Sequence, residues 1–129
     1  SPDNDRDHWD IIEGQGSLFH PSFAGVSLGL LHGSQPDAFI VCHEPTRTQM
    51  RGVEAALPSI GDVIEQTVQC GKLTNKNIHC IGIALNTSNM KNNKSDIKKE
   101  ISSQYQLPCI DPITDNLDPF IDLLEKIND

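Results

Sequence analysis

The stretch "IHCIGIAL" (residues 78–85) decides the fold that we expect of this chain. Its apolar side chains follow one another without the alternation of apolar and polar residues found in strands with one face in water. A continuous apolar run of this length indicates a strand covered on both faces, as in a parallel sheet. Three other runs have the same character, and we expect a strand at each of them: residues 9–12, 38–43 and 108–110.

Helical patterns separate these runs. Apolar residues recur at helical spacing in four segments, at residues 23–32, 60–68, 95–104 and 117–124, and Gly71 lies near the end of the second. Gly33 would end the first helix, and Ser95 would cap the third. The alternation of strand and helix predicts an α/β fold with a parallel sheet and right-handed crossovers. In such sheets ligands bind at the carboxyl ends of the strands. Most of the polar residues that could bind a ligand or take part in a reaction follow those ends.

Composition excludes several classes of partner. Eighteen acidic and ten basic residues give a net charge of −8, which argues against binding to nucleic acid or to an anionic membrane surface. The four cysteines form no CxxC pair and are expected to be buried free thiols rather than metal ligands. The polar N-terminus shows no export signal, and with reduced thiols this indicates the cytoplasm.

The segment "EGQGS" (residues 13–17) ends the first expected strand in a carboxylate, two glycines and a hydroxyl. Glu13 could hold Mg²⁺ directly or through water, because Mg²⁺ binds carboxylate oxygens. Gly14 and Gly16 would let the backbone approach a phosphate, and Ser17 could donate a hydrogen bond to it. The alternative is a strand-to-helix turn with a structural carboxylate and a capping serine.

The segment "CHEPTRTQMRG" (residues 42–52) follows the second expected strand and carries two arginines. Arg47 and Arg51 are four residues apart, so on a helix they would share a face and suit an anionic ligand such as a dicarboxylate. The alternative is a solvated basic patch paired with nearby glutamates. His43 and His20 are candidate general bases, although a lone histidine can equally be a hydrogen-bonded structural residue.

Much of the chain resembles the P-loop domain of the D-glutamate N-acetyltransferase-like family. The resemblance lies in "WDIIEGQGSLFHPSFAGVSLGLLHGSQPDAFIVCHEPTRTQMRG" (9–52), "IEQTVQCGKLTNKNIHCIGIALNTSNM" (64–90) and "CIDPITD" (109–115). The end of the first strand and "GIALN" are also distantly similar to dethiobiotin synthetase and its P-loop relatives. In those relatives an asparagine reads a purine edge, and the likeness assigns that role to Asn86, whose alternative role is to cap a turn.

The resemblance implies a P-loop NTPase-like, Rossmann-like three-layer α/β sandwich. The chain lacks the GxxxxGK motif followed by Ser or Thr that such domains carry. We therefore expect residues 1–129 to be the C-terminal portion of one domain that is incomplete at its N-terminus. Exposed sheet edges would then pair with a second copy or with the missing N-terminal half.

Three functions follow from this. The first is an N-acetyltransferase that uses acetyl-CoA and acts on an acidic amino acid such as D-glutamate. In it, His43 or His20 would act as base, Arg47 and Arg51 would hold the substrate, and Gly14, Gly16, Ser17 and Asn86 would contact the cofactor. The second is an ATP- and Mg²⁺-dependent phosphoryl-transfer or ligase-type enzyme in which Glu13 helps to hold the metal. The third is a non-catalytic remnant, since the phosphate loop is absent from this chain.

Overall fold

A parallel three-stranded sheet forms the centre of the protein. The structure, a computed structural model, describes residue 5 and residues 7–127. The strands are β1 (Ala38–His43), β2 (His79–Leu85) and β3 (Cys109–Ile110). They lie in the order β1-β2-β3, and both neighbouring pairs are parallel. The predicted α/β fold with a parallel sheet is confirmed, and three of the four expected strands are present.

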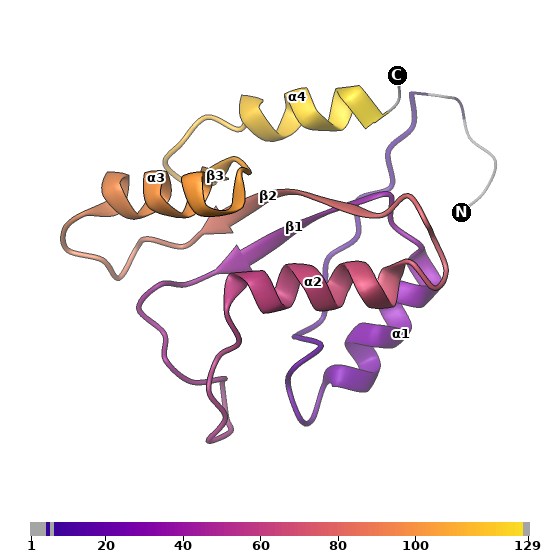
Figure 1. The fold of residues 1–129 in the computed structure, drawn as a ribbon, viewed down its shortest axis with the longest axis horizontal. Helices are drawn as coiled ribbons and strands as arrows, with labels where there is room; N and C mark the ends of the chain where they lie inside the picture. Colours follow the sequence, from indigo (N-terminus) through magenta and orange to yellow (C-terminus); the bar gives the residue numbers. More distant parts are fainter. Residues whose placement is uncertain (1–4, 6, 128–129) are drawn as a thin grey trace.

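Four helices surround the sheet (Figure 1). They are α1 (Ala24–Ser34), α2 (Ile60–Gly71), α3 (Lys94–Tyr105) and α4 (Asp118–Ile127). In Figure 1, α4 lies on one side of the sheet and α2 lies on the other, with α1 packed against α2. None of the helices within the described part of the chain is long and apolar enough to cross a membrane.

The core lies on the face of the sheet that α2 and α3 cover. Ile83 and Leu85 on β2 are completely buried there. Ile60 of α2 and Ile101 of α3 pack into the same cluster. Removing such side chains from water stabilises the fold by about 2 kcal/mol each. Burial of β2 on both faces explains why its sequence is continuously apolar.

The opposite face is built around a glycine. Gly82 of β2 has no side chain, and the ring of Phe120 from α4 occupies the space where one would lie. A Cβ atom added to Gly82 would come within 2.2 Å of the Phe120 ring. Phe120 is itself buried. This close approach seats α4 on β2.

Helix ends differ in detail from the sequence prediction. α1 continues through Gly33 and ends before Gln35, which adopts a left-handed backbone with φ of 49°. α3 begins at Lys94 after Asn93, which has φ of 62° and makes no side-chain cap, so the predicted Ser95 cap is wrong. Asparagine tolerates the left-handed region and can mark a helix boundary without a capping hydroxyl.

The strand predicted at residues 9–12 is absent. This segment belongs to no strand or helix, and Ile11 is 95% exposed. In Figure 1 the chain before α1 crosses the sheet instead of running along β1. An apolar run becomes a strand only when another strand pairs with it, and no strand among the described residues does so.

One side of β1 is also uncovered. Ile40 is 38% exposed and Cys42 is exposed, because both point to the face on which α4 packs against β2. The expectation that the four cysteines are buried is therefore wrong for Cys42 and holds fully only for Cys109, since Cys70 and Cys80 are partly buried. Parallel strands normally have both faces covered, so this bare face is an unusual feature of the described structure.

We predict that Gly82→Ala destabilises the protein by about 1–3 kcal/mol, because the new methyl group overlaps the Phe120 ring. Chemical unfolding monitored by circular dichroism measures this. Gly29→Ala is the matched control: Gly29 lies inside α1 with open space around its Cα, so alanine should leave stability unchanged or raise it by up to about 1 kcal/mol. Equal effects of the two substitutions would contradict the packing of α4 on Gly82.

Candidate functional site

Polar segments that follow the three strands meet at one edge of the sheet. The backbone N–H of Asn86, just after β2, donates to the carbonyl of His43 at the end of β1, at 2.9 Å. We call residues 43–47, 86–89 and 111–115 the strand-end rim. Direct hydrogen bonds join the first of these segments to the second and the second to the third. The predicted clustering of polar residues at the carboxyl ends of β1, β2 and β3 is present.

Glu44 is the centre of the first part of the rim. Its Oε1 atom accepts hydrogen bonds from Asn89 Nδ2 at 2.6 Å and from Thr46 Oγ1 at 3.1 Å. Its Oε2 atom lies 3.0 Å from Nη2 of Arg47. The hydrogen bonds from Asn89 and Thr46, with a smaller contribution from Arg47, lower the pKa of Glu44. Glu44 is therefore a carboxylate that fixes Arg47 at the end of β1.

Asp111 joins the loop after β2 to the loop after β3. One oxygen, Oδ2, accepts from the hydroxyl of Thr87 at 2.5 Å and from its backbone N–H at 3.2 Å. The other oxygen, Oδ1, accepts from the N–H of Ile113 at 3.0 Å. Asp111 is only 4% exposed, and the Thr87 hydroxyl is the main cause of the lowered pKa of its carboxyl group.

A second aspartate continues this network. Asp115 Oδ2 accepts from Lys98 Nζ at 2.6 Å and from the backbone N–H of Asp111 at 2.8 Å. Lys98, on α3, is also the main cause of the lowered pKa of Asp115. Sequence reasoning placed residues 111–115 among the strand-end segments but did not single out either aspartate. The spacing of two aspartates four residues apart, directly after a strand, was the available signal.

His43 is half-buried at the end of β1. Burial lowers the pKa of its imidazole, and the nearby carboxylate of Glu44 opposes that shift. The neutral ring is therefore favoured near pH 7, which is the form that a general base needs. The location of His43 at the rim agrees with the role predicted for it, which remains a prediction.

Asn86 lies exposed on the same rim. Its Oδ1 atom accepts from the Ser88 N–H at 3.1 Å and from the Ser88 hydroxyl at 2.6 Å. This is the local turn that was the alternative to purine recognition. The contact uses the carbonyl oxygen of the amide, so the amide group can still serve as a donor toward a ligand.

The segment at residues 13–17 is an exposed turn that leads toward α1. Gly16 has φ of 74°, and a Cβ atom there would meet Phe23 Cβ at 3.2 Å. Ser17 Oγ accepts from the Phe19 N–H at 3.1 Å. Glu13 and Gly14 are exposed. Within residues 5 and 7–127, no group of three or more His, Cys, Asp or Glu side chains is arranged to hold a metal ion.

The two predicted arginines do not share a helix. Residues 44–59 form a loop with a small antiparallel hairpin, closed by the bridge between Gln49 and Ala56. Arg51 and Gly52 form its exposed turn, and Gly52 has φ of 76°. Arg47 instead pairs with Glu44. The glycine that adopts a left-handed backbone favours a tight turn over a helix at this point.

His20 is buried beneath this hairpin rather than open to solvent. Its Nε2 atom lies 3.0 Å from the backbone oxygen of Arg51, and its Nδ1 atom accepts from the Ser22 N–H at 3.1 Å. The structure thus brings the segment at residues 13–20 into contact with the arginine hairpin through His20.

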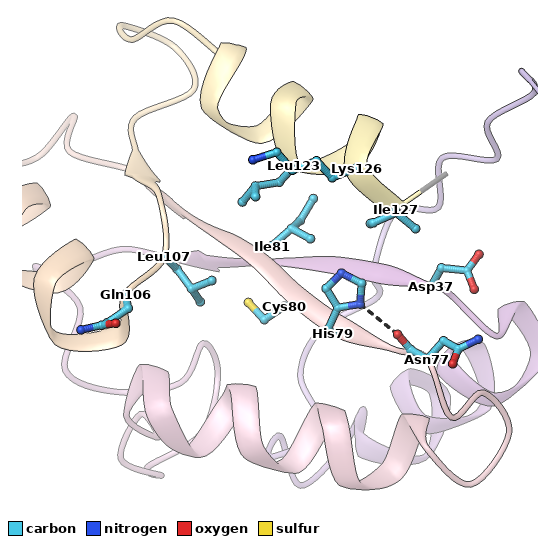
Figure 2. Close-up of a pocket in the computed structure, with 10 residues that line it drawn as sticks. All are labelled: Asp37, Asn77, His79, Cys80, Ile81, Gln106, Leu107, Leu123, Lys126 and Ile127. Carbon is cyan, nitrogen blue, oxygen red and sulfur yellow. Dashed lines mark hydrogen bonds between the residues drawn. The ribbon is translucent and has the colours of Figure 1, made fainter. Parts of the chain in front are cut away.

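A cavity lies at the other end of β2 (Figure 2). It encloses about 590 Å³ between the start of β2 and the C-terminal half of α4. Its lining includes Asp37, His79, Leu123 and Lys126, and the dashed line in Figure 2 marks the 2.9 Å hydrogen bond between His79 Nδ1 and the oxygen of Asn77. None of the predicted site residues lines this cavity. The strand-end rim, rather than this cavity, is therefore our candidate site.

Comparison with known proteins gives one family and two close relatives. Residues 1–121 match the family described as "Domain of unknown function (DUF1611_C) P-loop domain". A D-glutamate N-acetyltransferase from Pseudoalteromonas sp is 50% identical over 123 residues, which is 94% of this chain and 37% of the relative. A D-glutamate N-acetyltransferase from Tritonibacter scottomollicae is 42% identical over 129 residues, which is 98% of this chain and 39% of the relative. The chain thus spans well under half the length of these relatives.

We predict that Thr87→Val lowers the free energy of unfolding by about 1–3 kcal/mol at about pH 7, because Asp111 loses a buried hydrogen-bond donor. The folded state lowers the pKa of the Asp111 carboxyl group, which stabilises the fold at pH values above the ordinary pKa of about 3.9. That stabilisation is lost as the pH falls through the lower pKa of the folded state. The difference between variant and wild type should therefore narrow at about pH 3.

Urea unfolding at the two pH values measures this difference. Thr48→Val is the control, since Thr48 is exposed in the loop after β1. A loss of stability from Thr87→Val that is equal at both pH values would contradict the role assigned to the Thr87–Asp111 pair.

Proposed function

We propose a function from one premise: this chain belongs to the family described as "Domain of unknown function (DUF1611_C) P-loop domain". The proposal is that the chain forms part of an N-acetyltransferase that acts on D-glutamate. The observation that carries it is the identity of 50% and 42%, over nearly the whole chain, to two proteins of that name. The strand-end rim supports it with the imidazole of His43 at the end of β1 and with Arg47 in the loop that follows.

The proposed reaction transfers an acetyl group from acetyl-CoA to the amine of D-glutamate. The amine nitrogen attacks the thioester carbon, a C–N bond forms, and the C–S bond breaks. The amine loses a proton, and the thiolate of coenzyme A leaves and takes up a proton. The protein must therefore supply a neutral base near the amine and cations for the two carboxylates of the substrate.

His43 is the base that we propose. Burial keeps its pKa below the ordinary value, so the ring is ready to accept a proton near neutral pH. Arg47 and Arg51 would bind the carboxylates of D-glutamate, since guanidinium groups match carboxylate geometry. Arg47 is held at the rim by Glu44, and Arg51 lies on the hairpin that follows it. His20, the other candidate base, has both ring nitrogens bound to backbone groups.

For the cofactor we propose contacts from Gly14, Gly16 and Ser17 and from Asn86. The positive φ of Gly16 supports close backbone approach to a phosphate. The chain has no GxxxxGK motif, so this chain alone does not provide the usual P-loop cradle for phosphates. Glu13 offers one carboxylate for Mg²⁺, which commonly takes one or two carboxylates together with substrate phosphates. We propose that Glu13 helps to hold Mg²⁺ only when a phosphate group is bound at the site.

A chimera tests this function. In the Pseudoalteromonas relative, the 123-residue region that aligns with this chain is replaced by this chain, and acetylation of D-glutamate is followed through release of free thiol from acetyl-CoA. We expect activity within about tenfold of that of the parent. His43→Gln in the chimera should reduce kcat by about 100-fold or more, because the base is lost.

His79→Gln is the matched control, because His79 is exposed at the opposite end of β2, and it should stay within about twofold of the unsubstituted chimera. The acetylation rate of the unsubstituted chimera should stay high at a pH somewhat below about 6.5. Burial lowers the pKa of His43, so its ring remains a neutral base at that pH. A folded but inactive chimera would contradict the proposed function. Full activity in His43→Gln would contradict the proposed base.

We also propose that the bare face of β1 binds another polypeptide. Ile40 on this face is exposed, as are Trp9, Ile11 and Ile12 in the segment before α1, and β1 is an edge strand of the described sheet. Apolar residues on an open sheet edge favour pairing with another chain. The partner would be a second copy of this chain or the additional part that makes the relatives longer. The four free thiols support a proposed location in the cytoplasm.

Sedimentation measures this association. We expect the purified chain to form concentration-dependent oligomers, and we expect Ile40→Lys to weaken them by about tenfold or more, because a charge then lies on the apolar face. Lys76→Glu changes an exposed charge in the loop before β2 and should leave the association unchanged. A chain that stays monomeric at all concentrations would contradict self-association.

A further inference from the structure

His20 connects two segments that the sequence keeps far apart. It belongs to the turn that leads into α1, and it contacts Arg51, 31 residues further along the chain. Its side chain is buried, with 8% exposed, and its ring lies 4.7 Å from the ring of Phe23. A histidine in this position is shielded from solvent and fixed in orientation by its neighbours.

The hydrogen bonds of His20 define its protonation state. Its Nδ1 atom accepts the N–H of Ser22, so Nδ1 carries no proton. Its Nε2 atom lies 3.0 Å from the carbonyl oxygen of Arg51, which can only accept, so Nε2 must carry the proton and donate it. The ring is therefore the neutral Nε2–H form, and both nitrogens are occupied by backbone groups.

We propose that His20 is a positioning residue that clamps the hairpin turn at Arg51 and Gly52 to the segment at residues 13–20. The N–H donated to Arg51 sets the backbone from which the Arg51 side chain extends. The segment before His20 is bound to α1 by the Ser27 hydroxyl, which donates to the carbonyl of Gln15. The hairpin is thereby tied through His20 to a segment that is itself bound to α1. The consequence for Arg51 as a carboxylate ligand rests on the proposed function, whereas the clamp itself does not.

Substitution of His20 by glutamine or by asparagine separates the two hydrogen bonds that the ring makes. In His20→Gln the side-chain amide reaches the place of Nε2 and can still donate to the Arg51 carbonyl. In His20→Asn the amide reaches only the place of Nδ1, so it can bind Ser22 but not Arg51. Both variants lose the ring contact with Phe23, and they differ in which bond remains: His20→Gln keeps the bond to Arg51, and His20→Asn keeps the local bond to Ser22.

The rate of trypsin cleavage after Arg51 tests the clamp without any ligand, because Arg51 and Gly52 form an exposed turn. We expect His20→Asn to raise the rate of cleavage after Arg51 by about tenfold and to leave cleavage after Arg47 within about twofold of wild type. His20→Gln should restrict cleavage after Arg51 to within about threefold of wild type. Equal cleavage of the two variants, or no increase in His20→Asn, would overturn the clamp.

The wild-type chain provides a second measurement that does not depend on how well a variant folds. Nitrogen NMR at neutral pH should show His20 with its proton on Nε2, and the opposite form or a charged ring would overturn the proposal. The third measurement uses the chimera and D-glutamate. We expect His20→Asn to raise KM by about tenfold and to change kcat by less than about threefold, with His20→Gln restoring KM. A changed cleavage pattern with unchanged KM would keep the clamp and overturn the role of Arg51.

Discussion

Burial of β2 on both faces is the constraint on which the rest of the structure depends. Ile83 and Leu85 fill the core beneath the sheet, and Gly82 leaves room for Phe120 above it. Helices from both sides are thereby fixed to one strand. Because β1 and β3 pair with β2 in the same direction, their carboxyl ends reach the same edge. The polar loops that follow the three strands therefore meet at that edge and form the rim.

The rim is ordered by carboxylates whose partners hold them ionised. Hydrogen bonds from Asn89, Thr87 and Lys98 lower the pKa values of Glu44, Asp111 and Asp115, respectively. The bonds from Asn89 and Thr87 join the loops that follow all three strands, and the bond from Lys98 joins the last of these loops to α3. An anionic substrate at such an edge needs cations that the carboxylates do not neutralise completely. In the proposed function, Arg47 of the rim and Arg51 of the hairpin would supply them.

A partner that covers the bare face of β1 could also complete the proposed site. The relatives are more than twice as long as this chain, and they match it along nearly its whole length. The exposed segment at residues 9–12 has the composition of a strand but is not part of the sheet that the described residues form. A partner that paired with it would also lie near residues 13–17. The contact surface and the proposed phosphate contacts would then form together.

The sequence by itself determined the elements whose signals are local. Apolar runs placed β1, β2 and β3 to within one residue, and helical periodicity placed all four helices. The resemblance in residues 9–52 identified the family that the comparison confirmed. Only the tertiary structure decided that residues 9–12 lie outside the sheet, that Arg51 lies on a hairpin, and that Asp111 and His20 are buried hydrogen-bonding centres. These outcomes depend on strand partners and on bonds between residues that are up to 31 positions apart, and local periodicity carries no information about them.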